Sequence, residues 1–191
     1  MSKVLIFDLD DTLYPEITYV HSGFSAVASS LMEIYGWDSE DSFSYMQQVL
    51  ATMGRGNVFN ALLDSHGVLT KKAVRYCVSL YRHHRPRIQL DFEAEKFLRC
   101  FPCKPYLVTD GHKVVQAKKI EALGIESSFK KMYITHRYGL CHAKPSPYCF
   151  NLIRRSESCD WSDLIYVGDN PAKDFVSLNA LGAKTIRVLK G

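Results

Sequence analysis

Three acidic residues lie within four positions near the start of the chain. Asp8, Asp10 and Asp11 come directly after the apolar run 4–7. Carboxylates at the end of a buried segment are costly unless they are paired or bind a metal. A single acid there would suit an ordinary turn after a strand, whereas three favour a divalent cation. Because its ligands would be carboxylate oxygens, the pattern predicts a Mg²⁺ site.

A second acidic group follows another short apolar run, at 164–167. Asp169 comes directly after Gly168, and Asp174 lies five residues further on. Asp169 alone could be a helix N-cap or a turn residue, and Asp174 alone could be a first-turn charge favoured by the helix dipole. Two strand ends that both present carboxylates instead favour a shared ligand at one edge of a sheet.

Two further polar residues are candidates for binding a phosphate. Thr109 ends the run 106–109, and its hydroxyl, with the following backbone N–H groups from Asp110 on, could hold a phosphate oxygen. A plain helix cap is the alternative for Thr109. Lys144 precedes a proline-opened helix, where a lysine is ordinarily solvated; near carboxylates and a phosphate it would neutralise charge.

The elements that must position these residues alternate between strands and helices. Short apolar runs predict five strands, at 3–7, 106–109, 132–135, 164–167 and 185–188. Helical patterns lie between the later ones: 114–123 stopped by Gly124, one opened by Ser146–Pro147, and one opened by Asn170–Pro171 and closed by Gly182. This alternation predicts an α/β fold, a parallel Rossmann-like sheet with helices on both faces.

The middle of the chain is predicted to be helical throughout. Apolar residues recur every three or four positions over 17–34, 43–53, 58–63 and 73–81, and Thr70 is suited to cap the last of these. A further helix from Asp91 leads back to the second strand. We therefore expect an α/β core formed by 1–14 and 99–191, interrupted by a four-helix insertion at 15–98.

Composition narrows the class of protein. Of 191 residues, 47% are apolar and 23% charged, as in an ordinary globular protein, and the formal charge of +4 is too small to predict nucleic-acid binding. No apolar run reaches the length of a membrane span, and the N-terminus does not read as a signal peptide. We expect a cytoplasmic protein, a monomer or homodimer, with reduced cysteines.

In order and context, four segments resemble the four motifs of the haloacid dehalogenase-like hydrolase superfamily. They are Asp8-Leu9-Asp10-Asp11-Thr12, then Thr109, then Lys144 with its prolines, and Gly168-Asp169 through Asp174. The helical insertion is similar to the family's cap, which closes over the site and selects substrate. The resemblance implies a Mg²⁺-dependent phosphatase that works through an aspartyl-phosphate.

The resemblance also implies a role for each motif residue. Asp8 would attack phosphorus, and Asp10 would protonate the leaving oxygen and then deprotonate water. Mg²⁺ would bind the Asp8 carboxylate, the Asp10 backbone carbonyl and Asp169. Thr109 and Lys144 would hold the phosphoryl oxygens. Asp174 would order the metal ligands or orient Lys144.

The expected substrate is a small phosphorylated metabolite, either a sugar phosphate or a nucleotide. The acid at position 10 favours a phosphatase or phosphomutase over a dehalogenase, because the dehalogenase branch lacks an acid there. Arg55, between two glycines in the insertion, could read an anionic or hydroxyl-rich group or could simply be an exposed turn residue. A phosphotransferase on the same site and a non-catalytic phospho-ligand-binding module are the alternatives.

Overall fold

The computed structural model describes residues 3–189, and its centre is a five-stranded parallel sheet. The strand order is β3–β2–β1–β4–β5. The strands are β1 (Val4–Phe7), β2 (Tyr106–Thr109), β3 (Lys131–Ile134), β4 (Leu164–Gly168) and β5 (Lys184–Arg187). The predicted α/β class and all five predicted strands are confirmed, although β3 and β5 each begin one residue earlier than expected.

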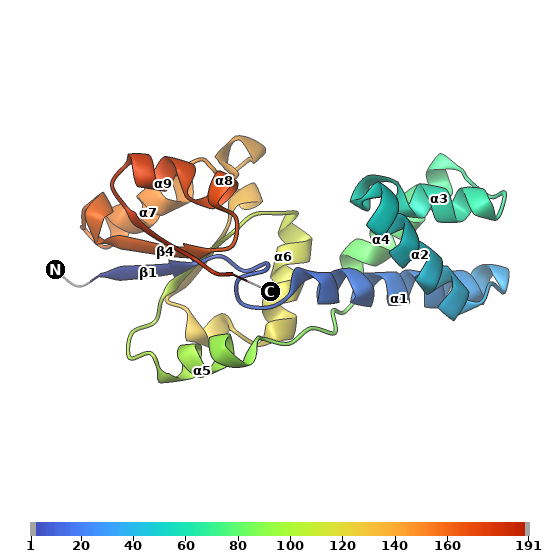
Figure 1. Ribbon diagram of the computed structural model, residues 1–191, viewed down its shortest axis with the longest axis horizontal. Helices are drawn as coiled ribbons and strands as arrows, with labels where there is room; N and C mark the ends of the chain where they lie inside the picture. Colours follow the sequence, from blue (N-terminus) through green and yellow to red (C-terminus); the bar gives the residue numbers. More distant parts are fainter. Residues whose placement is uncertain (1–2, 190–191) are drawn as a thin grey trace. The chain divides into compact units, whose positions relative to one another are not determined.

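Helices cover both faces of the sheet, as predicted. Figure 1 shows α7 and α9 on one side of β1 and β4, and α5 on the other. The helices that follow the insertion are α5 (Phe92–Cys100), α6 (Lys113–Leu123), α7 (Tyr148–Ser156), α8 (Pro171–Asp174) and α9 (Val176–Ala180). Short 3₁₀ turns are η2 (Glu126–Ser128), η3 (Thr135–Arg137), η4 (Leu140–His142) and η5 (Trp161–Asp163).

Alternate strand residues build the core on the α7 face. Ile6 of β1 and Tyr166 of β4 are fully buried there against Phe150 and Ile153 of α7. On the opposite face, the ring of Phe7 packs edge-on against Phe97 of α5, with ring centroids 5.5 Å apart. A strand buried on both faces is continuously apolar, which explains why β1 has no polar alternation.

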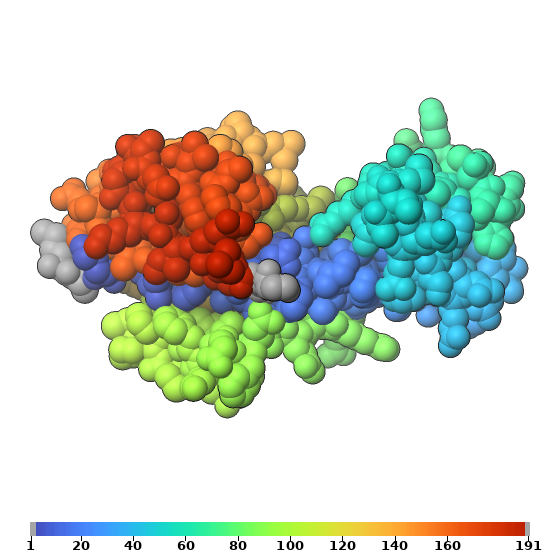
Figure 2. All heavy atoms as spheres, in the orientation of Figure 1, coloured from blue at the N-terminus to red at the C-terminus, as the bar shows by residue number. Residues whose placement is uncertain are grey.

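The register brings the carboxyl ends of the central strands to one edge. Phe7 of β1 is aligned with Val167 of β4, and the backbone N–H of Asp8 donates to Val167 O at 2.9 Å. The chain passes from β1 to β2 and β3 on one side, and then returns to β4 and β5 on the other. This reversal of strand order is the place where open α/β sheets bind ligands. Figure 2 shows early (blue) and late (orange to red) segments of the chain beside one another in the part of the molecule that contains the sheet.

The chain divides into two compact units. The sheet unit comprises the described residues up to Glu16 and those from Ile88 on, and the helical unit is Ile17–Arg87. We expected the insertion to extend to residue 98, but α5 belongs with the sheet. The backbone N–H of Asp91 donates to Leu13 O at 2.9 Å, and Phe97 packs against β1. The second boundary therefore lies before α5.

The helical unit is built from four α-helices around one apolar core. They are α1 (Glu16–Tyr35), α2 (Ser39–Met53), α3 (Val58–Ser65) and α4 (Lys71–His83), with η1 (Arg55–Asn57) between α2 and α3. The Thr70 side chain caps α4 as predicted, accepting the Ala73 N–H at 3.1 Å. The centre of the predicted α1 stripe is buried, but its ends, Ile17 and Ile34, are exposed. None of the helices within residues 3–189 combines the length and apolar character needed to cross a membrane.

Candidate active site

Asp8 is the first residue after β1, and its side chain is buried at the switch point of the sheet. Its Oδ1 lies 2.8 Å from Nζ of Lys144. No donor within residues 3–189 is aligned for a hydrogen bond to that oxygen, so the contact is an ion pair. Burial, together with the charges of Asp174 and Asp10, raises the pKa of Asp8 to about 7, although Lys144 acts to lower it. The ammonium of Lys144 therefore does not fully offset the effects of burial and of the neighbouring negative charges on Asp8.

Lys144 lies at the centre of this buried polar cluster, with its side chain 2% exposed. Its Nζ is 2.6 Å from Oδ1 of Asp174 and donates to the Tyr166 hydroxyl at 2.8 Å. Burial alone would lower the pKa of Lys144, but the charges of Asp8 and Asp174 raise it well above its ordinary value. Lys144 is therefore a permanent ammonium between two carboxylates.

The backbone of Lys144 is held by Asp110. Both carboxylate oxygens of Asp110 accept its N–H at 3.1 Å, and the Thr135 hydroxyl and Nζ of Lys173 also contact them. Burial acts to raise the pKa of Asp110, but these hydrogen bonds and lysine charges outweigh it and lower the pKa. The Asp110 side chain is occupied in this way, and the contact of its backbone N–H with a phosphate stays a prediction.

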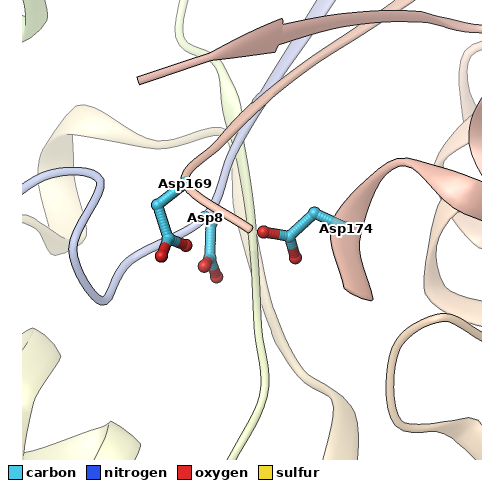
Figure 3. A group of neighbouring side chains, drawn as sticks. All are labelled: Asp8, Asp169 and Asp174. Atoms are coloured by element: carbon cyan, nitrogen blue, oxygen red, sulfur yellow. The ribbon is translucent and has the colours of Figure 1, made fainter. Parts of the chain in front are cut away.

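Three carboxylates converge beside Lys144. Asp8 follows β1, Asp169 follows β4, and Asp174 ends α8; one oxygen of each lies within 4.8 Å of the others. Figure 3 shows the three groups directed toward a common space. Gly168 makes this approach possible, because a Cβ at that position would lie 2.8 Å from Oδ2 of Asp174.

This cluster fits a divalent cation by its chemistry. Three oxygen donors from buried or half-buried carboxylates are the ligands that Mg²⁺ prefers. Burial, then the charge of Asp174, raises the pKa of Asp169, as expected where carboxylates crowd together. A cation would relieve this repulsion and would satisfy the Asp8 oxygen that has no hydrogen bond.

The cluster contains both expected carboxylate ligands and adds Asp174 to them. We expected Asp8, Asp169 and the backbone carbonyl of Asp10, with Asp174 in a supporting role. In the structure Asp174 joins the group and the Asp10 side chain does not. The alternative of a cap for Asp169 is wrong, because the N-cap of α8 is Asn170. Asp174 does have a local helical role as well, accepting the Asn170 N–H at 3.1 Å.

The carboxylate of Asp10 is directed toward α6. Its Oδ1 accepts from the Tyr14 hydroxyl at 2.6 Å and lies 2.7 Å from Nζ of Lys119. Its Oδ2 accepts from Nε2 of Gln116 at 2.8 Å. Asp8 and Asp10 lie only two residues apart in the chain, but their carboxylates contact different partners. This arrangement suits two different chemical roles.

Thr109 is buried at the end of β2, and its hydroxyl accepts from Nε2 of Gln116 at 2.6 Å. The N-cap of α6 is His112, so the alternative of a helix cap for Thr109 is wrong. Since the Thr109 oxygen already accepts a hydrogen bond, its own proton is available to a ligand.

Gln116 and Lys119 are two polar residues of this site that our sequence reasoning missed, as it also missed Tyr166 and Thr135. We expected the inner face of α6 to be apolar, but Gln116 and Lys119 are buried beside Ile120. The available signal was their spacing of three, which places both on one helix face directly after Thr109. Arg55, by contrast, is exposed in η1 of the helical unit, and its contact with substrate stays a prediction.

Comparison with known proteins agrees with this fold. Two archaeal proteins named glyceraldehyde 3-phosphate phosphatase, from Methanocaldococcus jannaschii and Methanopyrus kandleri, are each 26% identical to the chain. They match all of it, over 86% and 85% of their own lengths. A haloacid dehalogenase-like phosphatase structure from Thermococcus onnurineus matches with a TM-score of 0.59 at 19% identity, covering 98% of this chain and 86% of its own.

A second solved structure shares the fold. The 2-haloacid dehalogenase from Pseudomonas syringae matches with a TM-score of 0.65 at 21% identity, covering 98% of this chain and 86% of its own. A family model described as haloacid dehalogenase-like hydrolase matches residues 2–182. The chain is thus an enzyme of the haloacid dehalogenase-like hydrolase family.

Proposed function

We propose that this enzyme is a Mg²⁺-dependent phosphatase that hydrolyses a small phosphorylated sugar through an aspartyl-phosphate on Asp8. The observation that carries the proposal is the buried cluster in which Asp8 lies 2.8 Å from Lys144 and within reach of Asp169 and Asp174. A nucleophilic carboxylate, an ammonium and two further carboxylates at one sheet edge meet the needs of phosphoryl transfer.

Asp8, Asp169 and Asp174 would hold the cation, with the Asp10 backbone carbonyl as the fourth protein ligand expected from the sequence. The ion would supply positive charge that polarises the phosphoryl group and offsets the charge of the transition state. The chain's own ammonium does similar work, because Lys144 is fixed beside Asp8 and can hold a phosphoryl oxygen.

The first step forms a bond between an Asp8 carboxylate oxygen and phosphorus. The bond from phosphorus to the ester oxygen breaks, and that oxygen takes the proton of the Asp10 carboxyl group. Thr109 donates its hydroxyl proton to a phosphoryl oxygen, since its own oxygen already accepts from Gln116. The products are the free alcohol, the phosphorylated Asp8 and an Asp10 carboxylate.

The second step returns the enzyme to its starting state. The Asp10 carboxylate takes a proton from water, and the resulting hydroxide forms a new bond to phosphorus. The phosphorus–oxygen bond to Asp8 breaks and inorganic phosphate leaves. Direct attack of water on a phosphate ester is one of the slowest uncatalysed hydrolyses. The enzyme instead carries out two easier displacements, with Asp8 as the first nucleophile and water as the second.

The substrate class rests on the relatives and on position 10. The archaeal relatives are named for a three-carbon sugar phosphate, and an alkoxide leaving group needs the proton that Asp10 can provide. We propose that the helical unit, including Arg55 in η1, acts as a cap that selects the substrate. The expected setting is the cytoplasm, where such metabolites occur.

The test is phosphate release from a panel of phosphorylated metabolites that includes glyceraldehyde 3-phosphate, glycerol 3-phosphate, hexose phosphates and nucleotides. We expect activity on a small sugar phosphate, its loss on chelation and its loss in Asp8→Asn. Asp64→Asn, which changes an exposed carboxylate of α3, is the matched control and should retain activity. An Asp8→Asn protein as active as the parent would remove the nucleophile from the proposal.

A further inference from the structure

The polar side chains of α6 that face the sheet form a connected group around Asp10. Lys119 is 2% exposed and Gln116 is 1% exposed, although both carry groups that are costly to bury. Lys119 places Nζ 2.7 Å from Asp10 Oδ1 and 3.3 Å from Glu16 Oε1. The free-energy cost of removing this ammonium from water is offset by its two carboxylate partners only while they stay within these distances.

We propose that Lys119 and Gln116 are positioning residues that hold the Asp10 carboxyl group and the Thr109 hydroxyl in their reactive orientations. The inference rests on the proposed function, because it assigns their role through the acid–base group of that reaction. It also explains why one face of α6 carries a lysine and a glutamine where our sequence reasoning expected only apolar packing.

Gln116 connects two groups that would act on different atoms of the substrate. Its single amide nitrogen donates to Asp10 Oδ2 at 2.8 Å and to Thr109 Oγ1 at 2.6 Å. The reversed amide would set its carbonyl oxygen against the Asp10 carboxylate, so the donor assignment follows from charge. Both amide protons are then used, and the Thr109 proton is turned toward other acceptors.

The loop after β2 is shaped to accept Gln116. Gly111 has φ +135°, a conformation that other residues rarely adopt, and a Cβ there would lie 3.1 Å from Cδ of Gln116. The glutamine side chain therefore lies directly against the loop that begins with Thr109. Tyr14 completes the arrangement by donating to Asp10 Oδ1 at 2.6 Å. The Asp10 side chain thus has a defined direction before substrate arrives and before it takes up the proton that it gives to the leaving oxygen.

Lys119 has a further effect during the first step. As Asp10 gives its proton to the leaving oxygen, negative charge appears on the carboxylate 2.7 Å from the ammonium of Lys119. An interaction that strengthens as the transition state forms raises the rate rather than only the binding. The same contact keeps the carboxylate in place for the second step, when it receives a proton from water.

The experiment compares substrates whose leaving groups differ in their need for a proton. An alkyl phosphate requires general acid assistance, whereas 2,4-dinitrophenyl phosphate releases the stable 2,4-dinitrophenolate anion without it. We expect Lys119→Met to lower kcat/KM for the alkyl ester by about 100-fold and for the dinitrophenyl ester by less than about fivefold. Lys119→Arg, which keeps the charge, should recover part of the loss.

Gln116→Met gives a second, independent measurement through the ratio of the two kcat/KM values. It should reduce both through Thr109 and reduce the alkyl ester further through Asp10. Lys118→Met, at the adjacent, half-buried lysine of α6, is the control and should change neither value. Far-UV circular dichroism and thermal unfolding check the fold of each variant. If Lys119→Met does not fold, the ratio in Gln116→Met and the partial effect of Lys119→Arg decide the question.

Equal losses for the two esters, or no loss for either, would overturn the positioning role. Asp8→Asn measured in parallel separates the two proposals. If Asp8→Asn is inactive on both esters while the lysine and glutamine variants keep the parent's ratio, the positioning role alone fails. If Asp8→Asn is as active as the parent, the proposed phosphatase mechanism itself fails.

Discussion

The ammonium of Lys144 lies 2.6 Å from Oδ1 of Asp174 and 2.8 Å from Oδ1 of Asp8, so one buried lysine serves two carboxylates. Removing it by Lys144→Met should lower the free energy of unfolding by about 3–5 kcal/mol, because both acids then lie buried without their counter-charge. Urea unfolding of the metal-free protein measures this. Lys130→Met, which breaks an exposed ion pair with Glu157, should have a far smaller effect. Equal losses of unfolding free energy in the two variants would contradict the inference that a buried ion pair costs more to break than an exposed one.

Mg²⁺ affinity should depend strongly on pH. Burial raises the pKa of Asp8 to about 7, so a proton competes with the cation below that pH. Between pH 8 and pH 6 the deprotonated fraction of this single carboxylate falls about tenfold, and the affinity should fall by at least that factor. Isothermal titration calorimetry in buffers of different ionisation enthalpy should also record proton release on binding.

The Asp10→Asn variant provides the control for that titration. Because the Asp10 side chain is directed to Lys119 and Gln116, its loss should leave Mg²⁺ affinity within a few-fold of the parent. Asp169→Asn should weaken binding by at least about tenfold, as loss of a charged ligand. An affinity that is constant with pH, or that Asp10→Asn abolishes, would show that different groups bind the ion.

The two steps of the reaction should separate in Asp10→Asn. With 2,4-dinitrophenyl phosphate, whose departure needs no proton, we expect a burst of about one dinitrophenolate per enzyme. Turnover should then be slower by about 10²–10⁴-fold, because the base that activates water is missing. Rapid-quench kinetics measures both phases. Asp8→Asn should produce neither phase, and a burst in that variant would place the phosphoryl group elsewhere.

Asp110 should stabilise the fold in a pH-dependent way. Burial acts to raise its pKa, but the hydrogen bonds of Thr135 and Lys144 and the nearby lysines lower it below its ordinary range. A carboxylate whose pKa is lower in the folded state stabilises the protein above the unfolded pKa of about 4. Asp110→Asn should therefore cost about 1–3 kcal/mol at pH 7.

That difference should shrink as the pH falls below about 4, because the unfolded chain then binds a proton at Asp110 before the folded protein does, and it should vanish once the folded carboxyl group is protonated as well. Thermal unfolding of the parent and of Asp110→Asn across this range measures it. Asp160→Asn, which changes a carboxylate outside this cluster, gives a comparison for general effects of charge at acid pH. If the stability difference between the parent and Asp110→Asn instead grew as the pH fell, the pKa of Asp110 would be raised, not lowered, by folding.

Patterning along the chain was sufficient to predict the sheet and the meeting of its strand-end acids. Five short apolar runs separated by helical patterns predict parallel strands, and parallel strands end at a common edge. It follows that Asp8 and Asp169, which succeed β1 and β4, should lie close together, and the structure has them in one cluster. The family followed from motif order in the same way, and the matched model confirms it.

Patterning could not decide where side chains point once several polar groups share that edge. Asp10 turns to α6 and Asp174 joins the acid cluster because of what packs beside them: Lys119 and Gln116 in one case, Lys144 and Gly168 in the other. The end of the insertion likewise depended on α5 packing against β1. Sequence periodicity reports which face of an element is apolar, whereas the partner of a buried charge is chosen by residues distant in the chain. Only the tertiary structure brings those residues together.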